Sequence, residues 1–473
     1  MKVFTNPGVT TQPHRILILG GGYVGLYTAL RLRRRLKRRE ATITVVDPRS
    51  YMTYQPFLPE ASAGSLSPRH VVVPLRRVLK DVEVINARVT GLDHDRRRAT
   101  LDPLHGTPYE VAYDSVVVAL GSVARTLPIP GLAEQGVGFK TVEEAIYLRN
   151  QVLHSLDVAE SMWGSAGGQG AEPDAGRRRR ALTFVVVGGG YAGIEALAEL
   201  EDLARDATSY YRTLSPADLR FVLVEATDRI LPEVGADMGA YTVRQLRERG
   251  IDVRLETRLE SVVGGHVVLS DGESFDTDTL IWTAGVKANP ALASFGLPLD
   301  EKGRLRCLPT LQVEGVPGAW GAGDAAAVPD LTKPGELCGP SAQHAVRQAR
   351  RLADNLVATL RGKAPKDYRH AYVGSVASLG LHQGVAQVYG IKLRGLPAWF
   401  MHRTYHLSRV PTLNRKMRVV SDWTLALFFR RETVSLGSLA RPFDEFESAA
   451  GRVRSTAEAE ERGGHALAGS ERA

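Results

Sequence analysis

The stretch that decides the fold is RILILGGGYVGLYTALRLRRRL, residues 15–36. A short apolar run leads into Gly20-Gly21-Gly22-Tyr23-Val24-Gly25, a G-x-G-x-x-G pattern, and an amphipathic helix pattern follows it. In such a loop Gly20 permits a tight turn, Gly22 lets the backbone approach a pyrophosphate, and Gly25 lets helix and strand pack closely. The helix N-terminus then holds the phosphates through unpaired N–H groups and its dipole. The stretch therefore predicts a dinucleotide-binding fold.

A second stretch of the same kind, LTFVVVGGGYAGIEALAELEDLA, covers residues 182–204. Its three pattern positions are taken by Gly188, Gly190 and Gly193. After each copy comes a further strand that ends in an acid, Asp47 in ATITVVD and Glu225 in RFVLVE. An acid at that position accepts hydrogen bonds from ribose hydroxyls and repels a 2′-phosphate. The sequence thus predicts an α/β protein with two Rossmann-like dinucleotide-binding domains.

Composition excludes several classes of protein. The chain has 473 residues, 44% hydrophobic and 24% charged, so wholesale disorder is excluded. No apolar run reaches ~18 residues, which excludes an ion-pumping membrane subunit, and the first residues lack the apolar core of a signal peptide. Two cysteines, Cys307 and Cys338, cannot form a disulfide framework or a four-cysteine metal site, and no metal is predicted.

The net charge of +8 favours contact with an acidic partner, either anionic lipid or nucleic acid. No basic helix-turn-helix pattern is present, so we expect no nucleic-acid binding. The alternative for the charge is an arginine-rich solvated surface.

A third segment, TLQVEGVPGAWGAGDAAAV, runs from Thr310 to Val328. A strand that ends in Gly-Asp would place Asp324 where its carboxylate can bind the hydroxyls of a flavin ribityl chain. Two dinucleotide folds in one chain suggest a bound flavin in one and NADH in the other. A helix with a clean apolar stripe is predicted over residues 341–360 and is expected to begin just after Gly323-Asp324. Its N-terminus would stabilise negative charge on a reduced flavin.

These motifs together resemble the two-dinucleotide-binding flavoprotein disulfide-reductase superfamily and, within it, type II NADH dehydrogenase, the non-pumping NADH:quinone oxidoreductase. The resemblance covers roughly residues 15–439. Besides the two glycine loops it rests on TYQPFLPEASAGSLSP (53–68), VVVALGS (116–122), LIWTAGVKANP (280–290), GAGDAA (321–326) and PSAQHAVRQ (340–348). The order and spacing of these motifs make the resemblance specific.

The resemblance implies two cofactor sites, with hydride passing from NADH to flavin N5 and two electrons then passing to a membrane quinone. FAD would be bound by Gly20, Gly22, Gly25, Asp47, Gln55, Asp324 and Ala342. NADH would be bound by Gly188, Gly190, Gly193 and Glu225. Glu195 matches a catalytic glutamate near the place where nicotinamide stacks on flavin. The alternative for Glu195 is an acid that only stabilises its helix start through the dipole.

The helix near the quinone departs from the family pattern A-Q-x-A-x-Q. Here the run is Ala342-Gln343-His344-Ala345-Val346-Arg347-Gln348, so arginine stands where the family has its second glutamine. Gln348 lies about 140° around the helix from Gln343, whereas Gln343 and Arg347 share a face. We therefore predict Gln343 and Arg347 as the catalytic residues toward the quinone. The alternative is that Arg347 pairs with a surface carboxylate.

The C-terminal part is predicted to be an amphipathic helical segment for membrane association. Residues 396–410 interleave aromatic residues with His and Arg, and DWTLALFF follows, flanked by Arg430 and Arg431. Aromatic and cationic residues on segments too short to span describe helices lying in the interface. The family resemblance then implies a peripheral protein on the cytoplasmic face of the cell membrane. The alternative is a helical layer packed on the body or on a second subunit of a homodimer.

Four parts are predicted along the chain. They are an FAD-binding domain over 12–135 and 287–393, an NADH-binding domain over 136–286 with a mobile insert at 161–180, the membrane segment over 394–442, and a disordered tail over 448–473. Two other functions stay open. One is a flavin-bound NADH sensor with little turnover, and the other is a sulfide:quinone reductase, which would need cooperating cysteines on both sides of the flavin.

Overall fold

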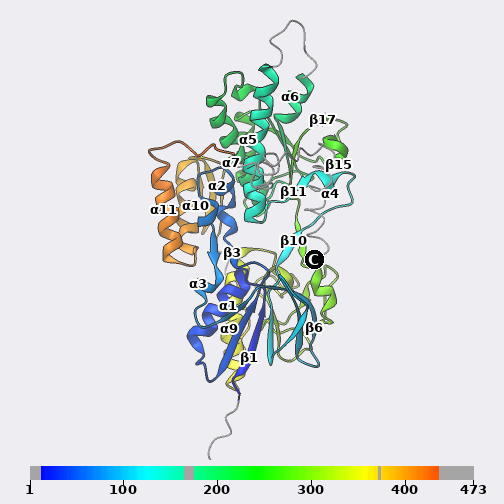
Figure 1. The fold of residues 1–473 in the computed structure, drawn as a ribbon, viewed down its shortest axis with the longest axis vertical. Coiled ribbons are helices and arrows are strands. Elements are labelled where there is room, and N and C mark those ends of the chain that lie inside the picture. The colour runs from blue at the N-terminus through cyan, green and yellow to red at the C-terminus, as the bar shows by residue number, and fades with distance from the viewer. Residues whose placement is uncertain (1–11, 165–174, 371–373, 436–473) are drawn as a thin grey trace, which may run out of the picture. The chain divides into compact units, whose positions relative to one another are not determined.

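The computed structural model describes residues 12–164, 175–370 and 374–435. Its first sheet has the strand order β21-β9-β1-β2-β5, and all neighbouring strands are parallel (Figure 1). The strands are β1 (His14–Leu19), β2 (Ala41–Val46), β5 (Glu83–Ile85), β9 (Ser115–Val118) and β21 (Ala319–Gly321). Every position of β9 is buried, as expected for a parallel strand covered on both faces.

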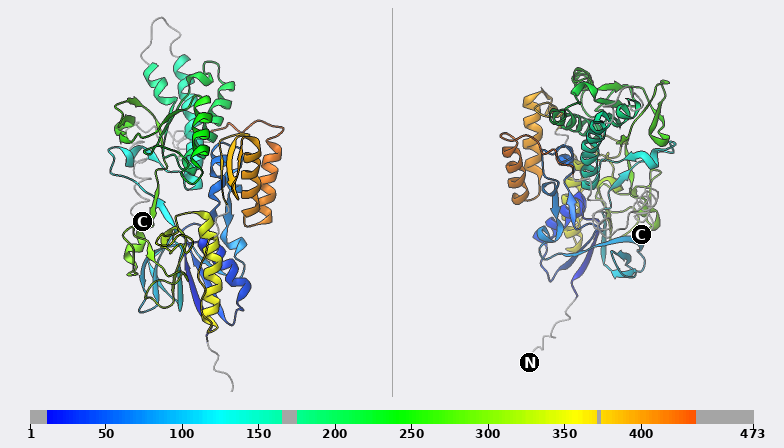
Figure 2. Two further views of the ribbon diagram at one scale, coloured as in Figure 1. Left: turned by 180° about the vertical axis from the view of Figure 1, so that it is seen from behind. Right: turned by 45° about the horizontal axis from the view of Figure 1, so that its top comes forward.

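Two helices pack side by side against this sheet, α1 (Tyr23–Arg35) and α9 (Ala342–Leu360), as both views in Figure 2 show. Their contact is held by Asp354 of α9, whose carboxylate accepts hydrogen bonds from Arg31 and Arg35 of α1. The arginine run at the end of α1 is thus partly used in packing. Nearby segments of the same half are β3 (Tyr51–Thr53), α2 (Leu58–Ser62), β4 (Val72–Pro74), α3 (Leu75–Val78), β6 (Ala87–Asp93), β7 (Arg98–Pro103) and β8 (Tyr109–Ala112).

The second sheet repeats the arrangement, with the order β11-β18-β12-β13-β14 and parallel neighbours throughout. Its strands are β11 (Gly136–Val137), β12 (Thr183–Val187), β13 (Arg220–Val224), β14 (Asp252–Arg254) and β18 (Thr279–Trp282). Its helices are α4 (Leu132–Gln135), α5 (Val142–Gly164), α6 (Ala175–Ala181), α7 (Tyr191–Ala207) and α8 (Ala236–Glu248). A small antiparallel sheet follows, β15 (Leu259–Ser261), β16 (His266–Leu269) and β17 (Ser274–Asp276).

The chain passes between the two halves through the antiparallel pair β10 (Ser122–Ala124) and β19 (Val286–Ala288). The domain boundaries stay a prediction. Within the predicted mobile insert at 161–180, residues up to 164 end α5 and residues from 175 belong to α6, so both described ends are helical. Residues 165–174 and the predicted tail at 448–473 lie outside the described residues.

The last part is a three-stranded antiparallel sheet followed by two helices. Its elements are β23 (Gly374–Ser378), β24 (Gly384–Val388), β25 (Ile391–Arg394), α10 (Leu396–Arg409) and α11 (Leu413–Leu425). Helix α10 buries Trp399 and His402, and α11 lies beside it (Figure 2). The outer face of α10 leaves Phe400 63% exposed. Among the described helices, none is both long and apolar enough to cross a membrane.

Candidate functional site

The two glycine loops have the same geometry. Gly20 has a φ of +107°, and a Cβ there would lie 2.4 Å from the carbonyl oxygen of Ala119. A Cβ on Gly25 would lie 1.7 Å from the oxygen of Gly20, so only glycine lets helix α1 start this close to the strand. Gly188 and Gly193 repeat both features in the second loop.

The middle glycine of each pattern faces open space. Apart from the glycine itself and its two chain neighbours, no described atom lies within 4 Å of the position that a Cβ would take on Gly22 or Gly190. Each of these glycines is the residue just before a helix, α1 or α7. Open space in front of unpaired helix N–H groups is what a pyrophosphate needs.

The acid that ends each second strand bonds to its glycine loop. Asp47 Oδ2 accepts a hydrogen bond from Gly21 N at 2.7 Å, and Glu225 Oε2 accepts one from Gly189 N at 2.6 Å. The second oxygen of Glu225 accepts from the backbone and hydroxyl of Thr227. Burial raises the pKa of Asp47, while hydrogen bonds from the backbone N–H groups of Gly21 and Arg49 oppose that shift. The predicted glycines and acids thus come together in both halves.

Asp324 follows β21 in a short 3-10 turn, Gly323–Ala325. The Ser122 hydroxyl donates to Asp324 Oδ2 at 2.6 Å, and Lys140 Nζ lies 4.0 Å from the same oxygen and donates to Ser122 Oγ. Gln55 Nε2 donates to the carbonyl of Lys140 at 3.2 Å. The structure therefore joins the predicted Gln55 and Asp324 through Ser122 and Lys140. Ser122 stands in a quoted motif, but no sequence pattern singled out Lys140.

Helix α9 agrees with the predicted range 341–360, since Ser341 is its N-cap and Ala342 its first residue, but it does not follow Gly323-Asp324 directly. The expectation that it begins just after Gly323-Asp324 is wrong, because strand β22 (Ala326–Ala327) and a loop intervene before Ala342. The first turns nevertheless lie beside the Gly323 turn, since Gly323 N donates to Gln348 Oε1 at 2.7 Å. Gln348 is only 1% exposed, and through this hydrogen bond it holds the Gly323 turn against α9. The predicted FAD-binding residue Ala342 is exposed at the start of the helix.

Gln343 and Arg347 both contact the segment that follows α9. Gln343 Nε2 donates to the carbonyl of Gly374 at 3.0 Å, and its buried Oε1 has no hydrogen-bond partner among the described residues. Arg347 Nη1 donates to His370 Nδ1 at 2.7 Å. Burial lowers the pKa of His370 to about 4, so the imidazole is a neutral acceptor. Arg347 is thus held by a histidine.

Glu195 is buried in α7 at 7% exposure. Its Oε1 accepts a hydrogen bond from Ser378 N of β23 at 2.9 Å and lies 3.0 Å from His402 Nε2 of α10, a contact without hydrogen-bond alignment. Burial raises the pKa of Glu195 to about 8 and lowers that of His402 to about 3. Glu195 therefore bonds to a distant strand, which a purely dipole-stabilising acid would not need.

Comparison with known proteins identifies the family. The model of the pyridine nucleotide-disulphide oxidoreductase family matches residues 14–349. The chain belongs to this family. The resemblance drawn from the motifs is confirmed at this level, and so is the α/β fold.

Individual relatives cover nearly the whole chain. The type II NADH:quinone oxidoreductase Ndh of Mycobacterium tuberculosis is 28% identical over 89% of this chain and 90% of its own length. The demethylphylloquinone reductase NdbB of Synechocystis is 30% identical over 88% of this chain and 96% of its own. The structure of NDH2 from Plasmodium falciparum in complex with NADH has a TM-score of 0.80 over 89% of this chain and 99% of that one. At 17% identity, that last likeness concerns the fold.

The name of the family refers to disulphide chemistry, but this member's cysteines do not suit it. Cys307 and Cys338 are both buried and free. Burial raises the pKa of Cys307 to about 12 and that of Cys338 to about 11. A thiolate is the reactive form, so both thiols are held in their unreactive state. This disfavours sulfide:quinone chemistry.

This family member also has a buried group of charges that sequence reasoning missed. Glu60 of α2 is 2% exposed, and its Oε2 accepts from Arg403 Nη2 at 2.9 Å and from Trp423 Nε1 at 2.6 Å. Glu199 of α7 is 1% exposed and faces Arg431 at 3.7 Å. Glu60 thus binds α10 and α11 to α2, while Glu199 of α7 faces Arg431, which follows α11. No local pattern marks them, because their partners are far apart in sequence.

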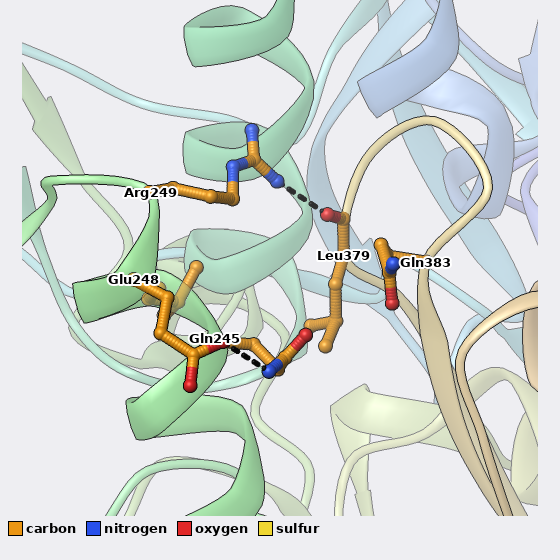
Figure 3. Close-up of a pocket in the computed structure, with 6 residues that line it drawn as sticks. Gln245, Glu248, Arg249, Leu379 and Gln383 are labelled. Atoms are coloured by element: carbon orange, nitrogen blue, oxygen red, sulfur yellow. Dashed lines mark hydrogen bonds between the residues drawn. The ribbon is translucent and has the colours of Figure 1, made fainter.

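Figure 3 shows a small cavity of about 130 Å³ between the end of α8 and the turn joining β23 to β24. It is lined by Gln245, Leu246, Glu248, Arg249, Leu379 and Gln383. Arg249 donates to the carbonyl of Leu379 at 2.6 Å, the upper dashed line in the figure. None of the predicted nucleotide-binding residues lines this cavity.

Proposed function

We propose that this chain is an FAD-dependent NADH:quinone oxidoreductase that works without pumping protons. The observation that carries the proposal is the repeated arrangement of glycine loop and bonded acid, one for each of two nucleotides. It is supported by relatives that are named as type II NADH:quinone oxidoreductases and match about nine-tenths of the chain.

The residues present fit both nucleotides. Open space at Gly22 and Gly190 leaves room for pyrophosphates at two helix starts. In the first half FAD would be held by Gly20, Gly22, Gly25, Asp47, Gln55, Asp324 and Ala342. In the second half NADH would be held by Gly188, Gly190, Gly193 and Glu225.

The protein's own residues bind, orient and exclude water, while bound FAD supplies the chemistry of accepting a hydride and passing on two electrons. Glu195, with its raised pKa, keeps a proton at neutral pH and adds no charge where the nicotinamide would lie. Gln343 and Arg347 would donate hydrogen bonds to a quinone carbonyl, and the donor with full charge gains most as negative charge develops.

An absorption spectrum tests the function directly. We expect the purified protein to show an oxidised flavin spectrum that anaerobic NADH bleaches and a quinone then restores. Rapid steady-state turnover with a soluble quinone would exclude the alternative of a redox sensor with little turnover. A protein that purifies without flavin and binds none would contradict the proposal.

We also propose that α10, α11 and the residues after them lie on the anionic cytoplasmic face of the cell membrane, as a peripheral attachment. Exposed apolar side chains gather there, including Phe400 at 63%, Leu427 at 75% and Phe428 at 77%. The cations Lys416 and Arg418 lie on the same helix pair, and each adds roughly 1 kcal/mol near an anionic leaflet. The inner face of α10, with Trp399 and His402, packs on the body, while its outer face is proposed to contact the membrane. The segment would therefore be both a packed helical layer and a membrane attachment.

Vesicle sedimentation tests the attachment. The double variant Phe400→Ser, Phe428→Ser should sediment less with anionic vesicles than wild type, and Leu104→Ser, which changes an equally exposed side chain elsewhere, should not. A wild-type protein that ignores vesicles but has the mass of a dimer would instead favour a second subunit on this face.

A further inference from the structure

Lys140 connects the region of the second sheet with the predicted flavin site. It stands in the turn between β11 and α5, which belong to the second sheet and its helices. Its side chain is only 26% exposed, although lysine is usually at the surface. A lysine this far from water needs a reason in the structure.

The backbone of Lys140 is held on both sides. Its N–H donates to Glu144 Oε2 at 2.6 Å, and its carbonyl accepts from Gln55 Nε2 at 3.2 Å. Gln55 belongs to the segment predicted to run past the flavin. The turn that carries Lys140 is therefore fixed against the segment that holds Gln55.

The ammonium group points at the residues that would hold the flavin. Lys140 Nζ donates to the hydroxyl of Ser122 and lies 4.0 Å from Asp324 Oδ2, while Ser122 itself donates to Asp324. Burial lowers the pKa of Lys140, and the nearby Asp324 and Glu144 oppose that shift. Because Asp324 lies at 4.0 Å with a hydroxyl between, it only partly balances the positive charge.

We propose that Lys140 is a further cofactor-site residue, whose ammonium stabilises the negative charge of reduced flavin more than it stabilises oxidised flavin. The inference rests on the proposed FAD site. A cation in a site that excludes water acts strongly on charge that develops during reaction. Lys140 lies between β11 and α5, which belong to the second sheet and its helices, so residues from both sheet regions would build the flavin site together.

Sulfite binding tests this without NADH or quinone. Sulfite adds through sulfur to N5 of oxidised flavin, and its electron pair leaves negative charge on the ring. We expect Lys140→Met to weaken sulfite affinity tenfold or more and to lower the two-electron potential of the bound flavin. For a two-electron reduction, a tenfold change in the equilibrium constant corresponds to a change of about 30 mV in the potential. Lys140→Arg should stay within threefold of wild type.

Two controls separate the possible results. Lys287→Met removes an exposed lysine from the crossing strand β19 and should change neither measurement. Lys140→Gln keeps a hydrogen-bond donor but loses the charge, so it should behave as Lys140→Met. Should Lys140→Gln match wild type in sulfite affinity and potential, the charge is not used and the proposal is wrong. Equal weakening of oxidised FAD binding and of sulfite affinity would also overturn it. A wild-type protein that binds no FAD would instead refute the proposed function.

Discussion

His402 Nε2 lies 3.0 Å from Glu195 Oε1, and the two side chains are 2% and 10% exposed. Burial holds the pKa of His402 at about 3 and that of Glu195 at about 8. At neutral pH the pair is therefore a carboxylic acid beside a neutral imidazole. Helices α7 and α10, which are far apart in the sequence, meet through two uncharged but titratable groups.

The pH dependence of folding should reveal this pair. Folded Glu195 keeps a proton that the unfolded chain releases above pH 4.5, so its contribution is complete below pH 4.5 and is lost as pH rises through about 8. Unfolded His402 gains a proton below pH 6.5, so stability is lost as pH falls from 6.5 toward about 3. Between pH 4.5 and 6.5 the two effects offset each other. Above pH 6.5 only Glu195 of the pair changes the free energy of unfolding, which then falls by up to about 1.4 kcal/mol per pH unit until pH reaches about 8.

The variant Glu195→Gln isolates the glutamate, because its amide oxygen can still accept from Ser378 N. We expect its free energy of unfolding, measured in urea, to stay nearly level between pH 6.5 and 8, where wild type declines. Identical slopes in the two proteins would mean that Glu195 is ionised in the folded state.

Nucleotide preference should depend on Glu225. Its carboxylate bonds to the loop at Gly189, so a 2′-phosphate would meet a fixed negative charge. We expect a higher kcat/KM for NADH than for NADPH. Glu225→Gln should lower the ratio of kcat/KM for NADH to kcat/KM for NADPH about tenfold, equivalent to about 1.4 kcal/mol. Glu225→Arg should move the preference toward NADPH. Asp228→Asn, an exposed change in the same loop, should leave the ratio unaltered. Equal kcat/KM values in wild type would contradict the role of Glu225.

Substitutions at Gln343 and Arg347 should affect flavin reoxidation by quinone but not flavin reduction by NADH. We expect Gln343→Ala and Arg347→Ala to slow flavin reoxidation by quinone roughly ten- to hundredfold, as the loss of a hydrogen bond with a charged partner predicts. Anaerobic reduction by NADH should stay near the wild-type rate. Arg347→Gln restores the family pattern and should keep most activity. Stopped-flow measurement decides, and wild-type reoxidation in both alanine variants would place the quinone elsewhere.

The attachment of α10 should depend on the pair Arg403–Glu60. Its 2.9 Å contact joins side chains that are 12% and 3% exposed. Arg403→Met would leave Glu60 buried without its ion-pair partner, at a cost of about 3–5 kcal/mol in the free energy of unfolding. The double variant with Glu60→Gln should recover much of the loss.

The exposed Arg418→Met serves as the control for Arg403→Met and should change the free energy by no more than about 0.5 kcal/mol. Equal effects of the two substitutions in urea unfolding would mean that the Arg403–Glu60 pair does not hold α10. For the same reason, deletion of all residues from Gly395 should destabilise the body as well as abolish membrane contact, because it removes both partners of Glu60 and the contact of His402 with Glu195.

The sequence by itself determined the two glycine loops, the acids after them and the helix that carries Gln343. Each of these depends on interactions within a single strand-turn-helix unit, such as the approach of Gly25 to Gly20, so local residue order is enough to define them. The predicted range 341–360 agrees with α9, whereas the expectation that this helix directly follows Asp324 failed, because strand β22 and a loop intervene.

Only the tertiary structure decided which residues meet in the site. Lys140 reaches Asp324, and His402 reaches Glu195, across long stretches of chain. A lysine or histidine in a loop or helix carries no sign of its partner, because the same residue is solvated on one face and buried on another. The packing of elements sets both that burial and the charges nearby, and these determine the protonation state on which the proposed chemistry depends.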